Sequence, residues 1–493
     1  MLKHSFRSLF KDIAIYGFGD LIFRATSLLT LPIYTRIFSP ADYGILSYVL
    51  TIINLMSAVL ALGCTSAYSL YFFEAKTPEA KQLITSTSLI FVALSSVAAT
   101  LVCLPFATRI SIWSFGTGEH RLLFNLAFLS VPVGLINSMC GQVLRNQFQA
   151  RLFTVLNVGT AVLTIGFGLY AVVVMKLGLV GIVGGGLIAA CIMFPIRLWT
   201  VRDLLRPVFS YPMLKSLLAF GVPLVPMTLA YWVFEVSDRI ILGKLSTLEQ
   251  LGLYAVANTL TSGLAFVNGA LGQAWSPHAF KMRTEHPDVA PKFFGQVLTY
   301  ILVSFGVLCV GLTVFARELL VLLSSVKFYP AAFAIGPLAL GFVAYASTQV
   351  TAAGLSLAKK TAYFALFSWL AALLNIGLNI SFVPKWGMMA ASWSTAASYI
   401  FLTVAYMLAA QRYWPVSYEK YRATTVALLT FVFTVGVLAL PTMDFIAGLV
   451  VKSIYCLIYI ALLFLFHVLD QRELQGLLAF WRGMRVRAMG QES

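Results

Sequence analysis

The chain has 493 residues, of which 60% are apolar and 11% charged, and its mean hydropathy is +0.89. A soluble domain carries charge on about a quarter of its residues, so a chain this poor in charge must be solvated mainly by lipid. The net charge of +16 does not indicate a nucleic-acid-binding protein, because no segment carries the dense basic stripe that tracks phosphates. The six cysteines lie singly in apolar stretches, without metal or redox spacing, so we expect them to be packing residues.

Apolar stretches long enough to cross a bilayer, which takes about 20 residues, recur along the whole chain. They predict an all-α integral membrane protein with about 14 transmembrane helices. The predicted spans lie near residues 13–37, 44–73, 83–106, 122–144, 153–175, 178–199, 216–242, 251–276, 295–316, 333–357, 361–383, 387–410, 423–441 and 447–469. The first of them lacks a small-residue cleavage site, so we expect no cleavable signal peptide.

The basic residues predict the orientation of these spans. With the N-terminus in the cytoplasm and basic residues near the span ends assigned to the nearer side, the cytoplasmic side collects 23 of the 34 Lys and Arg residues, the opposite side collects ten, and Arg24 lies within a span. Positive charge collects on the cytoplasmic side of membrane proteins, so both termini are expected there.

The chain also repeats itself at an offset of 208 to 209 residues. Lys176–Gly181 recurs as Lys385–Ala390, and Gly44 recurs as Gly252. Six helices separate the copies, so we expect two parallel lobes related by a pseudo-two-fold axis along the membrane normal. The predicted parts are an N-terminal lobe of six helices (1–199), a cytoplasmic linker (200–215), a C-terminal lobe of six helices (216–412), two further helices (413–469) and a basic cytoplasmic tail (470–493).

Three blocks of sequence resemble the bacterial polysaccharide-export flippases. Tyr34–Gly44, which joins the first two spans, resembles a signature of that family. A second block begins at Phe220–Pro226 and runs on to Leu251–Tyr254. The third is Ala371–Asn379 followed by Pro384–Gly387, and it resembles the family's eleventh-to-twelfth helix hairpin. The blocks follow one another in the family's order through most of the chain.

The resemblance is to the Wzx-type O-antigen and exopolysaccharide flippases, in the superfamily shared with lipid II flippases and MATE exporters. It implies fourteen helices, two six-helix lobes and a location in the bacterial inner membrane. It also implies alternating access, with an undecaprenyl-pyrophosphate-linked oligosaccharide (an O-antigen, exopolysaccharide or capsule repeat unit) moved from the cytoplasmic to the periplasmic leaflet. The partners implied are that glycan lipid and the surrounding membrane lipids, with contact to the glycan polymerase machinery left open.

The first span holds two ionisable residues, Asp20 and Arg24, near mid-membrane. They are four residues apart and so share one helix face. One interpretation is a salt bridge that lets the helix insert. The other exposes Arg24 in a central cavity, where its planar donors would bind the pyrophosphate, as the cavity arginines of lipid II flippases suggest.

The seventh span carries a polar face that includes Glu235 and Asp238, followed by Arg239. A buried carboxylate such as Glu235 can exchange a proton or bind a cation, and thereby couple transport to a proton or Na⁺ gradient. Asp238 and Arg239 are candidates for gating or coupling, or for anchoring the helix at the interface. No bound cofactor is expected.

Uncharged polar side chains mark other helices, among them Asn54, Asn258 and Asn375. These can bind sugar hydroxyls or form interhelical hydrogen bonds, and the sequence does not decide between the two. Arg145, in the cytoplasmic gap after the fourth span, can meet the diphosphate at the cavity mouth or only fix the topology.

Two other functions fit parts of the sequence less well. A MATE-like, cation-coupled multidrug exporter shares the architecture, and Asp20 with Glu235 could supply its acidic coupling site. A membrane enzyme, such as a polysaccharide polymerase, needs a sizeable outer loop with catalytic groups. No outer gap is long enough, and the five His residues are scattered without a catalytic or metal constellation. We therefore expect no catalytic residues, no metal site and no enzyme activity.

Overall fold

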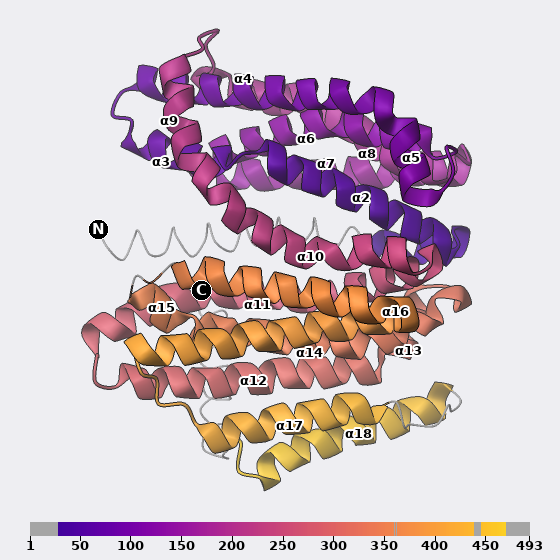
Figure 1. The fold of residues 1–493 in the computed structure, drawn as a ribbon, viewed down its shortest axis with the longest axis vertical. Coiled ribbons are helices and arrows are strands. Elements are labelled where there is room, and N and C mark those ends of the chain that lie inside the picture. The colour runs from indigo at the N-terminus through magenta and orange to yellow at the C-terminus, as the bar shows by residue number, and fades with distance from the viewer. Residues whose placement is uncertain (1–27, 359, 361, 438–444, 470–493) are drawn as a thin grey trace, which may run out of the picture. The chain divides into compact units, whose positions relative to one another are not determined.

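The computed structural model describes residues 28–358, 360, 362–437 and 445–469. Within these ranges every regular element is a helix and none is a strand, as Figure 1 shows. A helix satisfies its backbone hydrogen bonds within one segment, which an apolar surrounding demands. Nine helical segments in this part of the chain are long and apolar enough to cross a membrane. The all-helical membrane fold is confirmed, and the count of fourteen spans stays a prediction.

The first of two compact units comprises residues 28–260 together with 322–331 and 368–394. Within it, α6 packs against α4 and α8, and α7 packs against α8. These four helices lie side by side in Figure 1. The unit contains α2 (Pro40–Leu60), α3 (Cys64–Glu74), α4 (Pro78–Cys103), α5 (Ala107–Phe115), α6 (Arg121–Asn146), α7 (Ala150–Leu169), α8 (Gly178–Thr200), α9 (Tyr211–Gly221) and α10 (Val225–Leu245).

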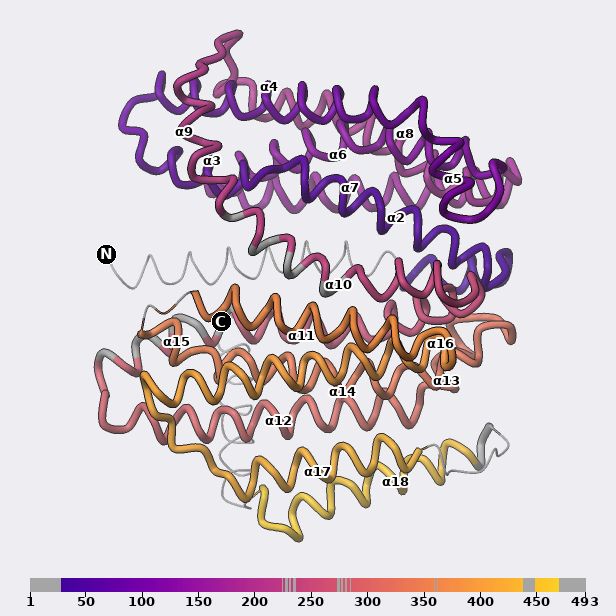
Figure 2. Tube along the Cα trace, in the orientation of Figure 1, coloured from indigo at the N-terminus to yellow at the C-terminus, as the bar shows by residue number. Residues whose placement is uncertain are grey.

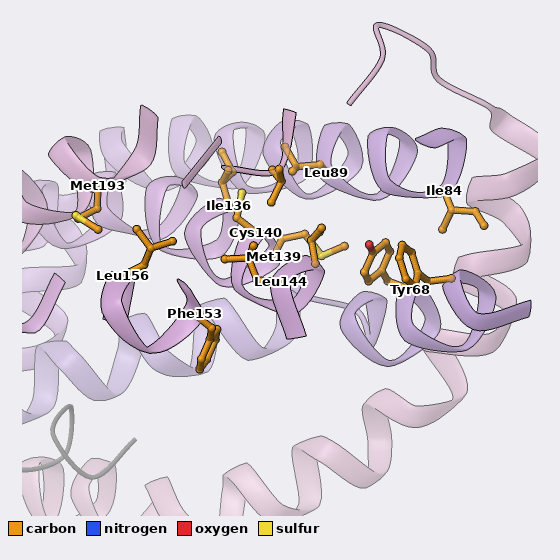
Figure 3. Close-up of a cluster of buried hydrophobic side chains, with 13 residues drawn as sticks. Tyr68, Ile84, Leu89, Ile136, Met139, Cys140, Leu144, Phe153, Leu156 and Met193 are labelled. Carbon is orange, nitrogen blue, oxygen red and sulfur yellow. The ribbon is translucent and has the colours of Figure 1, made fainter. Parts of the chain in front are cut away.

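Apolar side chains from α3, α4, α6 and α7 form a core inside this unit (Figure 3). Met139 and Cys140 of α6 are 1% and 0% exposed, and they lie in one cluster with Tyr68 and Phe153. Cys140 is therefore a small packing residue, as predicted. This core packs the ends of α3, α6 and α7 against one another. The polar side chains around Arg145 lie at these helix ends.

The linker predicted at 200–215 is tied to α4 by hydrogen bonds. The backbone N–H of Arg206 donates to Ser86 Oγ at 2.8 Å, and that of Ser210 donates to Thr87 Oγ1 at 3.2 Å. Ser210 also caps α9 by accepting from the N–H of Met213 at 3.3 Å. The buried hydroxyls of α4 thus accept hydrogen bonds from backbone N–H groups of the linker between α8 and α9, which have no partner within a helix.

The two copies of the sequence repeat share an unusual backbone feature. Gly178 and Gly387, equivalent in the repeat, both have left-handed φ angles, of +60° and +51°. At Gly387 this conformation breaks α16 (Ala362–Tyr413), which otherwise runs continuously through two predicted spans (Figure 2). Glycine is favoured there because other residues adopt this conformation at a steric cost. The break falls where the sequence predicts two spans to meet.

A second pair of repeat glycines forms a close helix crossing. Gly44 of α2 faces Leu248 of α11 (Leu248–Glu285), and Gly252 of α11 faces Pro40 of α2. A Cβ on Gly44 would lie 2.9 Å from the carbonyl carbon of Leu248, and one on Gly252 would lie 2.7 Å from that of Pro40. Pro40 and Leu248 are themselves related by the 208-residue offset. The contact is therefore reciprocal, as a two-fold relation between the copies requires.

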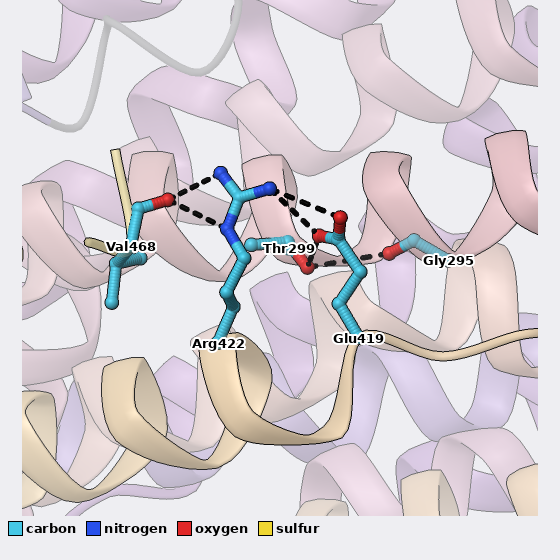
Figure 4. A network of polar contacts seen from close by, with 5 residues as sticks. All are labelled: Gly295, Thr299, Glu419, Arg422 and Val468. Atoms are coloured by element: carbon cyan, nitrogen blue, oxygen red, sulfur yellow. Dashed lines mark hydrogen bonds and ion pairs between the residues drawn. The ribbon is translucent and has the colours of Figure 1, made fainter. Parts of the chain in front are cut away.

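The second unit comprises the described parts of 261–321, 332–367 and 395–493. Its last two helices are pinned by one polar network (Figure 4). Glu419 accepts from Thr299 Oγ1 at 2.7 Å and pairs with Arg422 at 3.0 Å, and Arg422 Nε donates to the carbonyl of Val468 at 2.8 Å. The helices that lie wholly in this unit are α12 (Ala290–Val314), α14 (Ala332–Thr351), α15 (Ala353–Leu357), α17 (Lys420–Gly436) and α18 (Phe445–Leu465). All but the last two residues of α13 (Ala316–Leu323) lie in it as well.

Candidate functional site

A buried polar cluster joins α10, α11 and α16 in the first unit. Asp238 is 2% exposed, and its carboxylate accepts from Tyr254 Oη at 2.7 Å and from Asn379 Nδ2 at 2.6 Å. Asn375 and Asn379 are both 0% exposed, and Asn375 Oδ1 accepts from Asn379 Nδ2 at 3.0 Å and from Ser237 Oγ at 2.8 Å. Two residues singled out from the sequence, Asp238 and Asn375, are thus brought together through Asn379.

The donors and acceptors of this cluster do not all find partners. Among the described residues, Asn375 Nδ2 and Asn379 Oδ1 are buried with no hydrogen-bond partner. A buried, unpartnered polar atom is costly, and at a native site it calls for an explanation such as an ion or a water molecule. An O–H and an N–H donor face the Asp238 carboxylate, and of the two unpartnered amide atoms Asn379 Oδ1 is an acceptor and Asn375 Nδ2 a donor. No three His, Cys, Asp or Glu side chains come together anywhere among the described residues.

The other residues predicted for coupling are placed only in part. Asp20 and Arg24 lie outside the described residues. Glu235 lies in α10, but its side chain is also outside what the structure describes. Arg239 follows Asp238 in the sequence and is half-buried. Its Nε is buried without a hydrogen-bond partner among the described residues. The roles of these residues stay predictions.

The other two amides predicted to bind sugar lie on α2 and α11. Asn54 is exposed on α2, and Asn258 is half-buried on α11. Neither takes part in the hydrogen bonds described around Asp238. Asn54 is exposed and can therefore contact a ligand, whereas Asn375 is buried.

Arg145 lies in a second polar cluster, at the C-terminal end of α6. It is exposed, its guanidinium donates to Gln142 Oε1 at 3.1 Å, and it lies 5.0 Å over the ring of Phe153. Gln142 Nε2 in turn donates to Ser69 Oγ at 2.8 Å and to Asn146 Oδ1 at 3.0 Å. These bonds tie α3 to α6 and orient a cation at the surface, the property that anion binding needs.

Arg197 was not recognised from the sequence as a notable residue. It is 5% exposed on α8, and its NH2 group donates to Asn157 Oδ1 at 2.8 Å and to Thr160 Oγ1 at 3.0 Å. Its Nε has no partner, and no carboxylate of the described chain lies within ion-pair distance. A buried cation held only by neutral acceptors is costly. Its place inside the predicted span 178–199 is the signal that could have revealed it.

Comparison with known families gives one match that covers most of the chain. The model of a family described as polysaccharide biosynthesis protein matches residues 33–333. Comparison with curated proteins gives no match.

Solved structures give the fold. The chain is similar to lipid II flippase MurJ in an inward closed conformation, with a TM-score of 0.73 and 14% identity over 92% of this chain and 99% of that one. It is also similar to an inward-facing multidrug resistance MATE family transporter (TM-score 0.65, 15% identity, 82% and 95% coverage). A third is the Vibrio cholerae MATE transporter VcmN in its bent form (TM-score 0.57, 15% identity, 83% and 96% coverage). These likenesses establish a transporter fold of the MurJ and MATE type.

Proposed function

The chain belongs to the polysaccharide biosynthesis protein family, and from this premise we propose that it flips an undecaprenyl-pyrophosphate-linked oligosaccharide. Family and fold together make it a multi-pass membrane flippase or transporter. The cargo would be an O-antigen, exopolysaccharide or capsule repeat unit, carried from the cytoplasmic to the periplasmic leaflet of the inner membrane by alternating access. The observation that carries the proposal is the family match over residues 33–333 on a fold shared with a lipid flippase.

The chemistry of that cargo calls for cations within the transport path. A diphosphate carries negative charge through the bilayer, so its translocation needs guanidinium or ammonium groups that replace water around the phosphates. Arg24 is our candidate in the first span, and the exposed Arg145 is our candidate where the cargo first binds. Neutral amides such as Asn54 and Asn258 would contact sugar hydroxyls.

Export of the cognate glycan in cells that lack the chromosomal copy tests this proposal. We expect Arg24→Ala to lower export at least about tenfold and Arg24→Lys to retain part of it, because lysine keeps the charge and loses the planar donors. Arg202→Ala is the control, since Arg202 is an exposed residue of the predicted linker paired only with its neighbour Asp203 among the described carboxylates. Wild-type export by both Arg24 variants would contradict the proposed phosphate role.

We further propose that transport is coupled to a proton or Na⁺ gradient through the Asp238 cluster. Asp238 is buried, and unpartnered amide atoms of Asn375 and Asn379 lie beside it. Asp238→Asn should abolish any dependence of transport in vesicles on an imposed gradient, while Glu235→Gln tests the other predicted carboxylate. If transport by both variants depends on the gradient as the wild type does, neither Asp238 nor Glu235 takes part in coupling.

A MATE-like multidrug exporter is the second candidate. The observation in its favour is a buried carboxylate, Asp238, on a fold shared with MATE transporters, because acidic sites suit organic cations. The same cells distinguish the two: drug export would change their susceptibility to cationic dyes and leave the surface glycan intact. Loss of the glycan with unchanged susceptibility supports the flippase.

A further inference from the structure

Phe148 adopts a backbone conformation that favours glycine. It follows α6 with φ of +57°, and its N–H donates to the carbonyl of Arg145 at 3.0 Å, while the N–H of Gln149 donates to that of Leu144 at 3.0 Å. This pair of bonds is the Schellman motif that ends many helices, and Phe148 occupies its left-handed position, where glycine is usual. A bulky aromatic residue there is a steric outlier, and such an outlier points to a role for the side chain.

The ring of Phe148 does not stabilise the apolar core. It is 70% exposed, and its aromatic neighbour Phe73 of α3 is 57% exposed, with ring centroids 6.0 Å apart. Burial of an aromatic ring is what would offset such strain in a structural role. The strained residue therefore presents an aromatic surface to the outside of the bundle.

Polar groups adjoin this aromatic pair on the same helix ends. Asn146 precedes Phe148 by two residues, and its amide donates to Ser69 Oγ at 3.2 Å, one turn of α3 before Phe73. Arg145 is exposed next to it, with its guanidinium held by Gln142. The end of α6 thus presents aromatic rings and a charged planar donor together, next to the buried amide of Asn146.

We propose that Phe73, Phe148 and Arg145 form a patch that captures the sugar-diphosphate head group before translocation. The apolar C–H face of a sugar ring packs on an aromatic ring, and a guanidinium binds phosphate oxygens. The end of α6 lies on the side that the basic residues predict to be cytoplasmic, where the glycan lipid is made. This inference rests on the proposed flippase function and adds the residues that recognise the sugar.

Binding of soluble probes to the purified protein tests the two halves of the patch separately. UDP-glucose supplies a sugar diphosphate, inorganic pyrophosphate supplies the phosphates alone, and Kd is measured by calorimetry. Phe148→Gly should weaken UDP-glucose binding about tenfold and leave pyrophosphate binding unchanged, since only the aromatic surface is lost. Arg145→Gln should weaken both probes. Phe209→Leu, at an exposed aromatic residue of the linker, should change neither.

Thermal unfolding distinguishes binding from structure. Phe148→Gly relieves the left-handed strain, so its Tm should equal or exceed that of the wild type. A lower Tm with unchanged UDP-glucose binding would make Phe148 a structural residue and overturn the proposal. Phe73→Leu gives a second test of the aromatic surface without a backbone change.

Phospholipid head groups share the phosphate chemistry, so vesicles of phosphatidylglycerol form a further arm. If the variants weaken association with these vesicles and leave the soluble probes unaffected, the patch is a lipid anchor and the proposal fails. Glycan export is measured in parallel. Wild-type export by Phe148→Gly and Arg145→Gln would refute the patch and leave the flippase intact, whereas patch-dependent probe binding without any glycan export by the wild type would refute the flippase function.

Discussion

Alanine at Gly252 should force α2 and α11 apart where they cross. The added Cβ would overlap the carbonyl oxygen of Pro40, its nearest neighbour, and would lie 2.7 Å from the carbonyl carbon, 0.7 Å short of the 3.4 Å at which ordinary contact begins. The obstacle is helix backbone, which cannot rotate away as a flexible side chain can. Overpacking of this kind costs about 1–3 kcal/mol. Relative to a state in which the two helix ends are separated, the touching state would lose roughly fivefold to a hundredfold in population.

Labelling of a single introduced cysteine measures that shift. Ala41 lines a pocket of about 340 Å³ together with Glu249, next to the crossing. In a cysteine-free background, Ala41→Cys should react with a membrane-impermeant maleimide several-fold faster when Gly252→Ala is also present. Gly263→Ala is the matched control, because Gly263 lies on the same helix and a Cβ there meets nothing within 4 Å. That substitution should leave the labelling rate unchanged and slightly raise Tm, since alanine is the better helix former.

Reciprocity of the contact gives a sharper result. Gly44→Ala should raise the labelling rate much as Gly252→Ala does, because its Cβ would lie 2.9 Å from the carbonyl carbon of Leu248. Once either alanine has separated the helices, the other should add little. The increase in labelling rate in the double variant should therefore be clearly smaller than the sum of the two single effects on a free-energy scale. Full additivity, or labelling rates equal to that of Gly263→Ala, would refute the reasoning.

Three further substitutions probe the buried polar groups. Asp238→Asn replaces a carboxylate that accepts two hydrogen bonds with an amide, so one of the two donors loses its acceptor. The protein should lose about 1–3 kcal/mol of stability, measured as a lower Tm. Arg197→Lys keeps the charge but cannot reproduce the planar hydrogen bonds, one of them to Asn157, so its Tm should also fall; an unchanged Tm would show that the guanidinium geometry is not needed. Glu419→Gln removes the ion pair with Arg422 and should speed amide hydrogen exchange in α17 and α18 while leaving α6 unaffected.

The fold was predictable because lipid solvation leaves a strong one-dimensional signal. Long apolar stretches and basic gaps need no tertiary information, and the repeat adds the symmetry. The left-handed conformation at Gly178 and Gly387 even appears at matched positions of the two copies. Contacts between distant residues leave no such signal: nothing in the local sequence joins Asp238 to Asn379, 141 residues later, although they form one hydrogen bond.

Local sequence patterns predict a residue's role least well where that role depends on whether the side chain is buried. Arg197 lies three residues before the end of α8, so the charge pattern groups it with the cations that fix topology, yet it is 5% exposed. Phe148 reads as one more apolar residue, and only the backbone angle shows that it stands where glycine is favoured. Both properties arise from packing and from the ends of helices, which hydropathy does not describe.

The repeat duplicates backbone features but not the buried charges of Asp238 and Arg197. At the offset of 208 residues the counterpart of Asp238 is Thr30, and at 209 residues the counterpart of Arg197 is Tyr406. The buried acid therefore belongs to the second copy of the repeat, and the buried, unpaired guanidinium to the first. The two copies share a reciprocal backbone crossing at Gly44 and Gly252, whereas their buried charges differ. The two observations are compatible, because a substitution at a charged position inside one copy leaves the reciprocal backbone contact intact.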